Sequence, residues 1–191
     1  MISDSQYKQS ALDLKCSEAL IRGFAEVESG KLGGFSAPSK PVVLFEGHWF
    51  YRYTKGKYAA SHPHLCYPKW TKQFYCKNQA DEWARFQEAV ALDKTAALMS
   101  ASYGKFQVMG FNFSICGYKD VESFFLDMCK SEDFHLEAFE QYVKNTGLQD
   151  EMQRLDFAGL ARGYNGSEYS KNKYDEKIKK AYEKYKAQGF S

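Results

Sequence analysis

Glu28, in the stretch GFAEVESGKLGGF, is the residue whose position most clearly suggests chemistry. Apolar residues recur at helical spacing from about residue 17 to residue 29, which predicts an amphipathic helix. Steps of four from Leu20 through Phe24 reach Glu28, so its carboxylate falls on the apolar row. Burial and the negative end of the helix dipole both raise the pKa of such a carboxyl group. A carboxylic acid that stays protonated near neutral pH suits general acid catalysis, above all glycoside cleavage, whereas the alternative is a glutamate that extends into solvent from a frayed helix end.

The cysteines and histidines offer other candidate chemistry, but their spacing favours none. The five cysteines form no CxxC pair and no zinc-ligand spacing, so reduced thiols are expected. Cys66 lies near His62 and His64 and is the one sequence-local candidate for a nucleophile with a base. Pro63 between the two histidines favours a loop with surface histidines over a metal-binding strand. No metal and no other cofactor is expected.

Periodicity and start signals predict the elements that must position Glu28. Helices are expected near residues 7–15, 17–29, 78–92, 93–101, 120–130, 132–145, 148–163 and 172–187. Asn78, Asp120 and Ser131 are the expected N-caps of three of them. Val42, Val43 and Phe45 predict a short strand. The expected architecture is mainly α, with a small β element near residues 40–50.

Length and composition are those of one folded domain. At 191 residues, 44% of them hydrophobic and 26% charged, the chain can bury a core without a second domain, so a single domain over residues 1–191 is expected. Aromatic residues make up 17%, which suits either a cleft that stacks sugar rings or a densely packed core. Neither a membrane-spanning run nor a secretory leader is apparent, so the chain is expected to be made in, and to stay in, a cytosol.

Charge is nearly balanced at +2, but lysines gather in KNKYDEKIKKAYEKYK, residues 171–186. Ile178, Ala181 and Tyr182 give this segment an apolar flank, which favours a terminal helix docked on the domain with a solvated basic face. An anionic surface such as lipopolysaccharide or teichoic acid is the sharper candidate partner. Nucleic acid is not expected, because the rest of the chain is not basic and contains no recognition motif.

Three separated motifs carry a family resemblance. VES at residues 27–29, SYGKFQVMG at 102–110 and ARGYNG at 161–166 resemble motifs of goose-type lysozymes and soluble lytic transglycosylases. A closer and nearly continuous resemblance, over roughly residues 8–187, is to the phage and prophage N-acetylmuramidases, through AEVESGKLGGF, KPVVLFEGHWFYR, ASHPHLCYP, ASYGKFQVMGFNF and GLARGYNG. Tyr103 stands where that family often has tryptophan, and GYNG replaces the commoner AYNG.

The resemblance implies a lysozyme-like helical bundle around a catalytic helix. It also implies hydrolysis of the β-1,4 bond between N-acetylmuramic acid and N-acetylglucosamine in peptidoglycan, with Glu28 as general acid. It implies a monomeric endolysin without a separate wall-binding domain. Such a protein is made in the cytoplasm of the bacterial host, is released by a holin-type pore, and then acts in the periplasm on the cell wall.

Other site residues follow from the resemblance and from their neighbours. Glu46 follows the predicted strand, where it either activates water or merely orients the loop and holds His48. Tyr103 is the expected stacking face, and Gln107 either binds substrate or satisfies its own turn. The remaining expected substrate-binding residues are Ser29, which would hold the Glu28 backbone or a water, His48, Asn112, Tyr164 and Asn165.

Two rival functions remain open. A lytic transglycosylase would use the same glutamate as acid and then as base, and would release 1,6-anhydro products. A non-catalytic wall-binding protein of the same fold would be expected to lack the acid, yet Glu28 is present.

Overall fold

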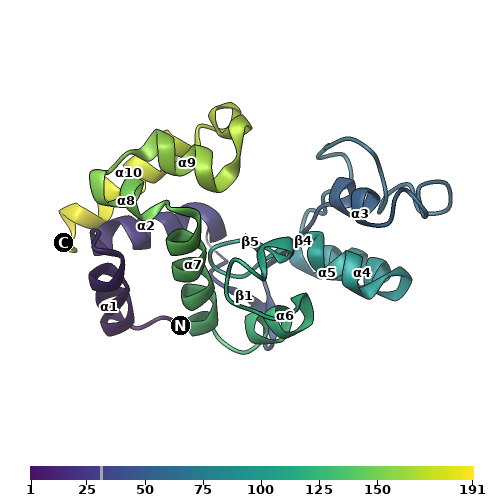
Figure 1. Ribbon diagram of the computed structural model, residues 1–191, viewed down its shortest axis with the longest axis horizontal. Coiled ribbons are helices and arrows are strands. Elements are labelled where there is room, and N and C mark those ends of the chain that lie inside the picture. The colour runs from purple at the N-terminus through teal and green to yellow at the C-terminus, as the bar shows by residue number, and fades with distance from the viewer. Residues whose placement is uncertain (31) are drawn as a thin grey trace.

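The chain folds mainly into helices, with two small antiparallel sheets (Figure 1). The computed structural model describes residues 1–30 and 32–191, apart from the side chain of residue 168. The α-helices are α1 (Asp4–Leu14), α2 (Glu18–Ser29), α3 (Gly47–Tyr53), α4 (Gln79–Leu92), α5 (Lys94–Met99), α6 (Val121–Met128), α7 (Glu132–Thr146), α8 (Gln149–Arg154), α9 (Phe157–Asn165) and α10 (Tyr174–Ala187). The strands are β1 (Phe35–Ala37), β2 (Lys40–Pro41), β3 (Val43–Phe45), β4 (Ala101–Tyr103) and β5 (Val108–Met109), and the 3₁₀ helices are η1 (Gly110–Asn112) and η2 (Ser167–Asn172). The expected mainly α fold with a small β element near residues 40–50 is confirmed.

Side-chain caps begin several helices where the sequence predicts them. Asn78 accepts a hydrogen bond from the Asp81 backbone at the start of α4. Asp120 does the same for Ser123 in α6, and the side chain of Ser131 caps α7. These caps satisfy backbone N–H groups that the first helical turn leaves without partners.

The β3–β4–β5 sheet positions the segments that follow its strands. β4 is central, and Val43, Leu44 and Phe45 of β3 pair antiparallel with its three residues. Phe45 faces Ala101 in this register, and Glu46 follows directly. The separate pair of β1 with β2 forms a small hairpin. Only the strand around Val43–Phe45 was expected from the sequence.

Three predicted helices have other boundaries in the structure, and one helix was missed. α1 begins at Asp4, where Ser3 and Gln6 form a capping box. The helix expected over residues 93–101 ends at Met99, because the next residues are the central strand β4. The helix expected over 148–163 is interrupted at Leu155, whose left-handed φ of 55° ends α8 before Asp156 caps α9. Helix α3 was not expected at all.

α2 lies in the middle of the helical half of the molecule. Leu20, Ile21 and Phe24 on this helix have no exposed surface. α10 packs closely along α2, and Gly23 makes this approach possible, since a Cβ atom there would lie 2.8 Å from the backbone nitrogen of Tyr182. The C-terminal helix is therefore part of the core packing.

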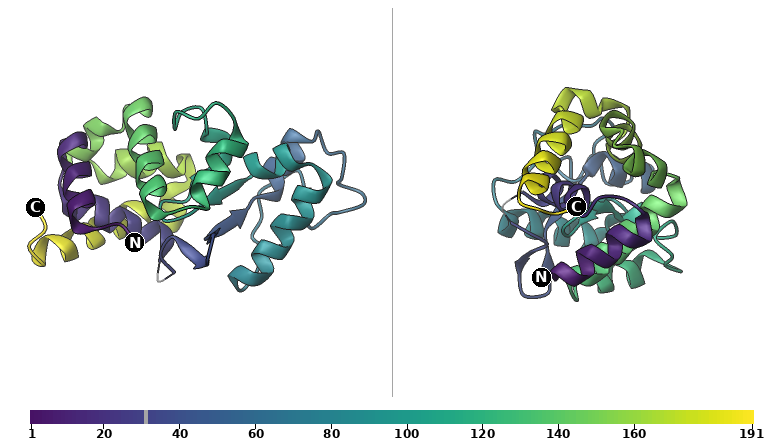
Figure 2. Two further views of the ribbon diagram at one scale, coloured as in Figure 1. Left: turned by 90° about the horizontal axis from the view of Figure 1, so that it is seen from below. Right: turned by 90° about the vertical axis from the view of Figure 1, so that its left-hand side faces the viewer.

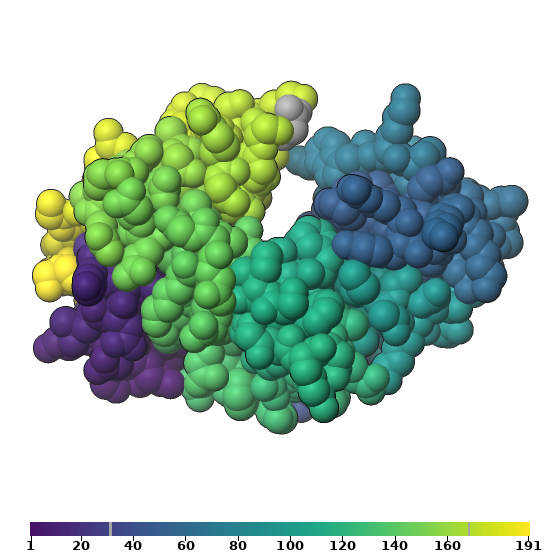
Figure 3. Space-filling view, in the orientation of Figure 1, coloured from purple at the N-terminus to yellow at the C-terminus, as the bar shows by residue number. Residues whose placement is uncertain are grey.

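The molecule has two lobes joined by the β3–β4–β5 sheet (Figure 2). One lobe contains α1, α2 and α7–α10, and the other contains α3, α4, α5 and the long segment between α3 and α4 (Figure 1). The space-filling view shows the surface deeply hollowed between the α9–α10 region and the α3 region (Figure 3). Within the described residues, none of the helices is both long and apolar enough to cross a membrane.

Candidate active site

Glu28 lies in the last turn of α2, one residue before the buried Ser29. Gly30 ends the helix with a left-handed φ of 57°, and its N–H donates to the Glu26 carbonyl. The Glu28 side chain continues the row of Leu20 and Phe24 and is partly exposed, whereas these two residues are fully buried. The expected placement on the apolar row is therefore observed, at the point where that row reaches the surface.

The protein surroundings of Glu28 favour its protonated form. Burial raises the pKa of the Glu28 carboxyl group to about 7. Asn165 opposes this by donating from Nδ2 to Glu28 Oε1 at 3.1 Å, and the positive charge of Lys177 also lowers the pKa. Desolvation is the largest of these effects, so the net shift is upward. A group of this kind can hold a proton and release it close to neutral pH.

Asn165 and Tyr164 come from the last turn of α9 and have different partners. Besides its bond to Glu28, Asn165 has a buried side-chain oxygen, Oδ1, without a hydrogen-bond partner among the described residues. Tyr164 donates to the Phe106 carbonyl at 2.8 Å and packs its ring edge-on against Phe24, with 4.6 Å between centroids. Asn165 thus positions the Glu28 carboxyl group, and Tyr164 fixes α9 against α2.

Glu46 directly follows β3 and serves as the N-cap residue of α3. Its carboxylate is buried and accepts a hydrogen bond from the Tyr75 hydroxyl at 2.6 Å. The other oxygen, Oε2, lies 3.3 Å from His48 Nδ1. Neither of these two atoms has a well-aligned hydrogen bond to a described residue. The contact with His48 and the placement at a strand end were both expected, and they leave the role of Glu46 open.

Tyr174, at the start of α10, lies near both carboxylates, which the sequence did not reveal. Burial and the negative charges of Glu28 and Glu46 raise the pKa of its phenol to about 12. Its hydroxyl group therefore lies within electrostatic reach of both carboxylates. In the sequence it belongs to the apolar flank of a basic helix, and only the packing of α10 on α2 brings it to the site.

The side-chain polar atoms of Gln107 and Ser29 form hydrogen bonds to other groups of the protein. Gln107 has a left-handed φ of 51°, accepts from Ser102 Oγ at 2.8 Å and donates to the carbonyls of Gly104 and Val42. This is the turn-satisfying role that was one of its two expected roles. Ser29 donates to the Ala25 carbonyl one turn earlier, at 2.7 Å, and does not hold the Glu28 backbone.

The position of Tyr103 does not fit the stacking role expected for it. It is only 1% exposed and donates its hydroxyl to the Leu98 carbonyl at 2.9 Å. The cause is that β4 is the central strand of its sheet, where all three residues are buried. Asn112 and His48 are partly exposed, and a substrate contact for them stays a prediction.

The cysteine and histidine candidates are not assembled into a second site. Cys66 is buried, and its thiol contacts the Thr54 hydroxyl at 3.7 Å. His64 pairs with Glu88 and His62 contacts Ser61. All five cysteines are free, and no cluster of metal-ligating side chains occurs within the part of the chain that the structure describes.

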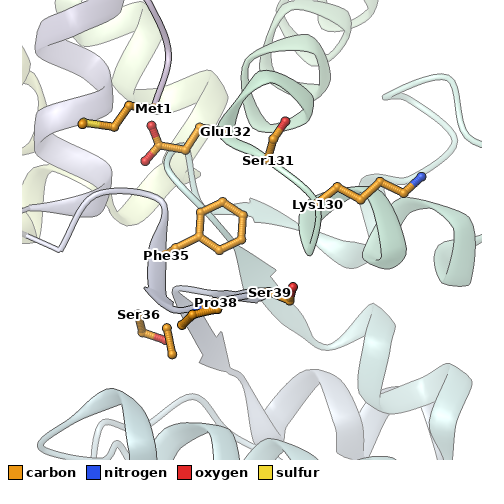
Figure 4. Close-up of a pocket in the computed structure, with 9 residues that line it drawn as sticks. Met1, Phe35, Ser36, Pro38, Ser39, Lys130, Ser131 and Glu132 are labelled. Carbon is orange, nitrogen blue, oxygen red and sulfur yellow. The ribbon is translucent and has the colours of Figure 1, made fainter.

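Two other depressions have linings that contain neither Glu28 nor Glu46. Figure 4 shows one of them, where Phe35 lies between Glu132 and Pro38. The other lies behind α2 and is lined in part by Arg22, Glu26 and Lys184. The cations there are paired, Arg22 with Glu18 and Lys184 with Glu26, each at 2.6 Å. The hollow between the lobes remains the candidate site.

Comparison with known proteins shows the family of the chain. A sequence model described as Muramidase, N-acetylmuramidase, matches residues 17–186. The structure is similar to the crystal structure of the Burkholderia AP3 phage endolysin, with a TM-score of 0.84 and 33% sequence identity. That alignment covers 98% of this chain and 72% of the endolysin chain. A search of curated proteins gave no match.

Proposed function

The chain belongs to the N-acetylmuramidase family and is a peptidoglycan hydrolase, and from that premise we propose that it cleaves the β-1,4 bond between N-acetylmuramic acid and N-acetylglucosamine with Glu28 as general acid. The observation that supports Glu28 is its combination of partial exposure, a pKa raised to about 7, and contact with Asn165. In this mechanism Glu28 protonates the glycosidic oxygen as the bond to the sugar breaks. Asn165 orients the carboxyl group by donating from Nδ2 to Glu28 Oε1.

Glu46 is proposed as the second carboxylate, on the opposite lobe from Glu28. In an inverting hydrolysis it would activate a water, which requires carboxyl groups about 6.5–9.5 Å apart, whereas a retaining reaction requires about 5 Å. Tyr174, whose phenol pKa is raised by the charges of both carboxylates, is proposed to contact a sugar bound between them. The anomeric form of the first product released, together with the activity of Glu46→Gln, separates these mechanisms.

Glu28→Gln tests the assignment of the acid. The amide keeps the shape of the side chain and its acceptor for Asn165 but has no proton to donate, so we expect activity on purified peptidoglycan to fall roughly 100- to 10,000-fold. The matched control is Glu26→Gln, on the same helix turn, where the carboxylate is paired with Lys184 and Tyr185 outside the site. Retention of more than about a tenth of wild-type activity by Glu28→Gln is incompatible with a general acid at this position.

A lytic transglycosylase is the alternative that one observation favours. Both Glu46 oxygens face protein groups, Tyr75 and His48, which leaves Glu28 as the carboxyl group open to act first as acid and then as base. Transglycosylation needs no second carboxylate, because the 6-hydroxyl of the sugar itself closes the anhydro ring. Mass spectrometry of digested peptidoglycan distinguishes the two, since anhydro products are lighter by one water molecule.

The biological setting is proposed from the similarity to a phage endolysin. The protein acts as a monomeric enzyme made in the cytoplasm of a bacterial host, and it reaches the periplasm and cell wall once a holin-type partner opens the membrane. Expression with and without a pore-forming partner tests this order of events. Lysis of the host without the partner would contradict it.

A further inference from the structure

Trp70 is exposed beside the proposed active site and has no role in the mechanism described above. It is 56% exposed, whereas Trp83 is buried and donates to the Pro41 carbonyl. Trp49 is partly exposed and packs on Phe111 with 4.7 Å between ring centroids. Burial of an indole ring stabilises a fold because its apolar surface is large. At this exposure Trp70 contributes little of that stabilisation.

Residues 67–75, here called the Trp70 loop, are held at both ends against the junction between β3 and α3. At one end, the Tyr67 hydroxyl accepts a hydrogen bond from the Gly47 N–H at 3.2 Å. At the other end, the Tyr75 hydroxyl donates to Glu46 Oε1 at 2.6 Å. Glu46 and Gly47 are consecutive, so the two tyrosines fasten the loop at a single point of the site. Trp70 is carried between them.

The Trp70 loop is also braced internally. The rings of Tyr67 and Phe74 pack with 5.1 Å between centroids, and the Lys72 ammonium lies 5.6 Å from the Trp70 ring centroid. The Trp70 side chain lowers the pKa of the Tyr75 phenol, so the two side chains lie close together. Tyr75 therefore connects the part of the loop that carries the exposed indole to the Glu46 carboxylate.

We propose that Trp70 is a sugar-binding residue of the cleft and that Tyr75 is a positioning residue linking it to Glu46. The inference rests on the proposed muramidase function. The ligand is the glycan strand, whose pyranose rings have an apolar face that suits an indole. Contact of a sugar with Trp70 holds the Trp70 loop in place, and the Tyr75 hydroxyl holds the Glu46 carboxylate. One loop thus both binds the sugar and orients the Glu46 carboxylate.

Binding is tested with glycan strands freed of their peptides, in the Glu28→Gln background so that the strands stay intact. We expect Trp70→Ala to raise the Kd measured by calorimetry roughly 5- to 30-fold, and Trp70→Phe, which keeps an aromatic face, to stay close to the parent. Leu126→Ala is the control, because Leu126 is similarly exposed, at 53%, on α6. An unchanged Kd in Trp70→Ala, or an equal loss in the control, overturns the inference.

The positioning role is tested separately with Tyr75→Phe in the otherwise wild-type enzyme. We expect kcat to fall with little change in KM, whereas Trp70→Ala should raise KM. Thermal denaturation of each variant checks that it folds. A Tyr75→Phe enzyme with wild-type kcat overturns the positioning role. A different result would contradict the proposed function itself: the wild-type protein would release no saccharides from peptidoglycan.

Discussion

At the scale of single residues, activity should follow the protonation of Glu28. With a pKa of about 7, the carboxyl group is protonated below neutral pH and loses its proton above it, so kcat should fall on the alkaline side with a midpoint near pH 7. Asn165→Ala removes the hydrogen bond that lowers this pKa, and the alkaline limb should move to higher pH. Rates on soluble glycan strands from pH 4 to 9 measure both effects. If Asn165→Ala loses activity at the same alkaline pH as the wild type, the Asn165 hydrogen bond does not lower the pKa of Glu28.

The same carboxyl group should reduce stability as the pH rises. Its pKa is about 7 in the folded protein and about 4.5 in an unfolded chain, so between these values the native state holds a proton that the unfolded state has lost. Raising the pH through this window destabilises the fold, by an upper bound of about 3 kcal/mol that partial exposure reduces. Glu28→Gln lacks this effect and should melt a few degrees above wild type at pH 8, with little difference near pH 4.5. If the difference in melting temperature between Glu28→Gln and wild type does not grow with pH, the pKa of Glu28 is not raised in the folded protein.

At the scale of elements, the contact between α2 and α10 should be intolerant of added volume. Gly23→Ala places a methyl group 2.8 Å from the Tyr182 nitrogen and 3.0 Å from the Ala181 carbonyl carbon. Overpacking of this kind costs about 1–3 kcal/mol, which exceeds the roughly 1 kcal/mol that alanine gains over glycine in a helix. We expect a lower melting temperature and a lower kcat, because α10 carries Tyr174. Glu183→Ala, on the exposed side of α10, is the control and should change neither.

The sequence predicts elements best where local signals decide them. Leu20, Phe24 and Glu28 share a row because helix geometry is local, and the Asn78, Asp120 and Ser131 caps act within one turn. Tyr103 could not be placed in this way. Its burial depends on β4 pairing with both β3 and β5, and the pairing with β3 spans nearly sixty residues of chain.

The break between α8 and α9 shows a local signal that was present but outweighed by periodicity. Asp156 accepts a hydrogen bond from the Gly159 N–H, an N-cap arrangement that the sequence DFAG is suited to form. The apolar pattern continues through Leu155, whose left-handed conformation is unusual for such a residue. Tyr174 had no local signal of function, because its place at the site depends on how α10 packs against α2.

At the scale of the whole molecule, the exposed lysines of α10 remain a proposed contact with anionic envelope polymers. Truncation before residue 171 would remove buried Ile178 and Tyr182 along with the charge, so charge reversal is the better test. We expect Lys179→Glu with Lys180→Glu to cleave purified peptidoglycan at the wild-type rate but to kill intact cells several-fold less well, an effect that salt should mask. Lys8→Glu with Lys15→Glu makes the same change on α1 and at its C-cap. Equal killing by both double variants would refute the role of α10.

The register of β3 on β4 has a consequence for how sequences of this kind can diverge. Val43, Leu44 and Phe45 are matched one to one with Tyr103, Ser102 and Ala101, and Glu46 is the next residue along. Gaining or losing one residue in this stretch would turn Glu46 to the opposite side of the strand. Evolution and protein engineering alike are therefore free to lengthen or shorten distant surface turns, while the segment from residue 43 to residue 46 must keep its length.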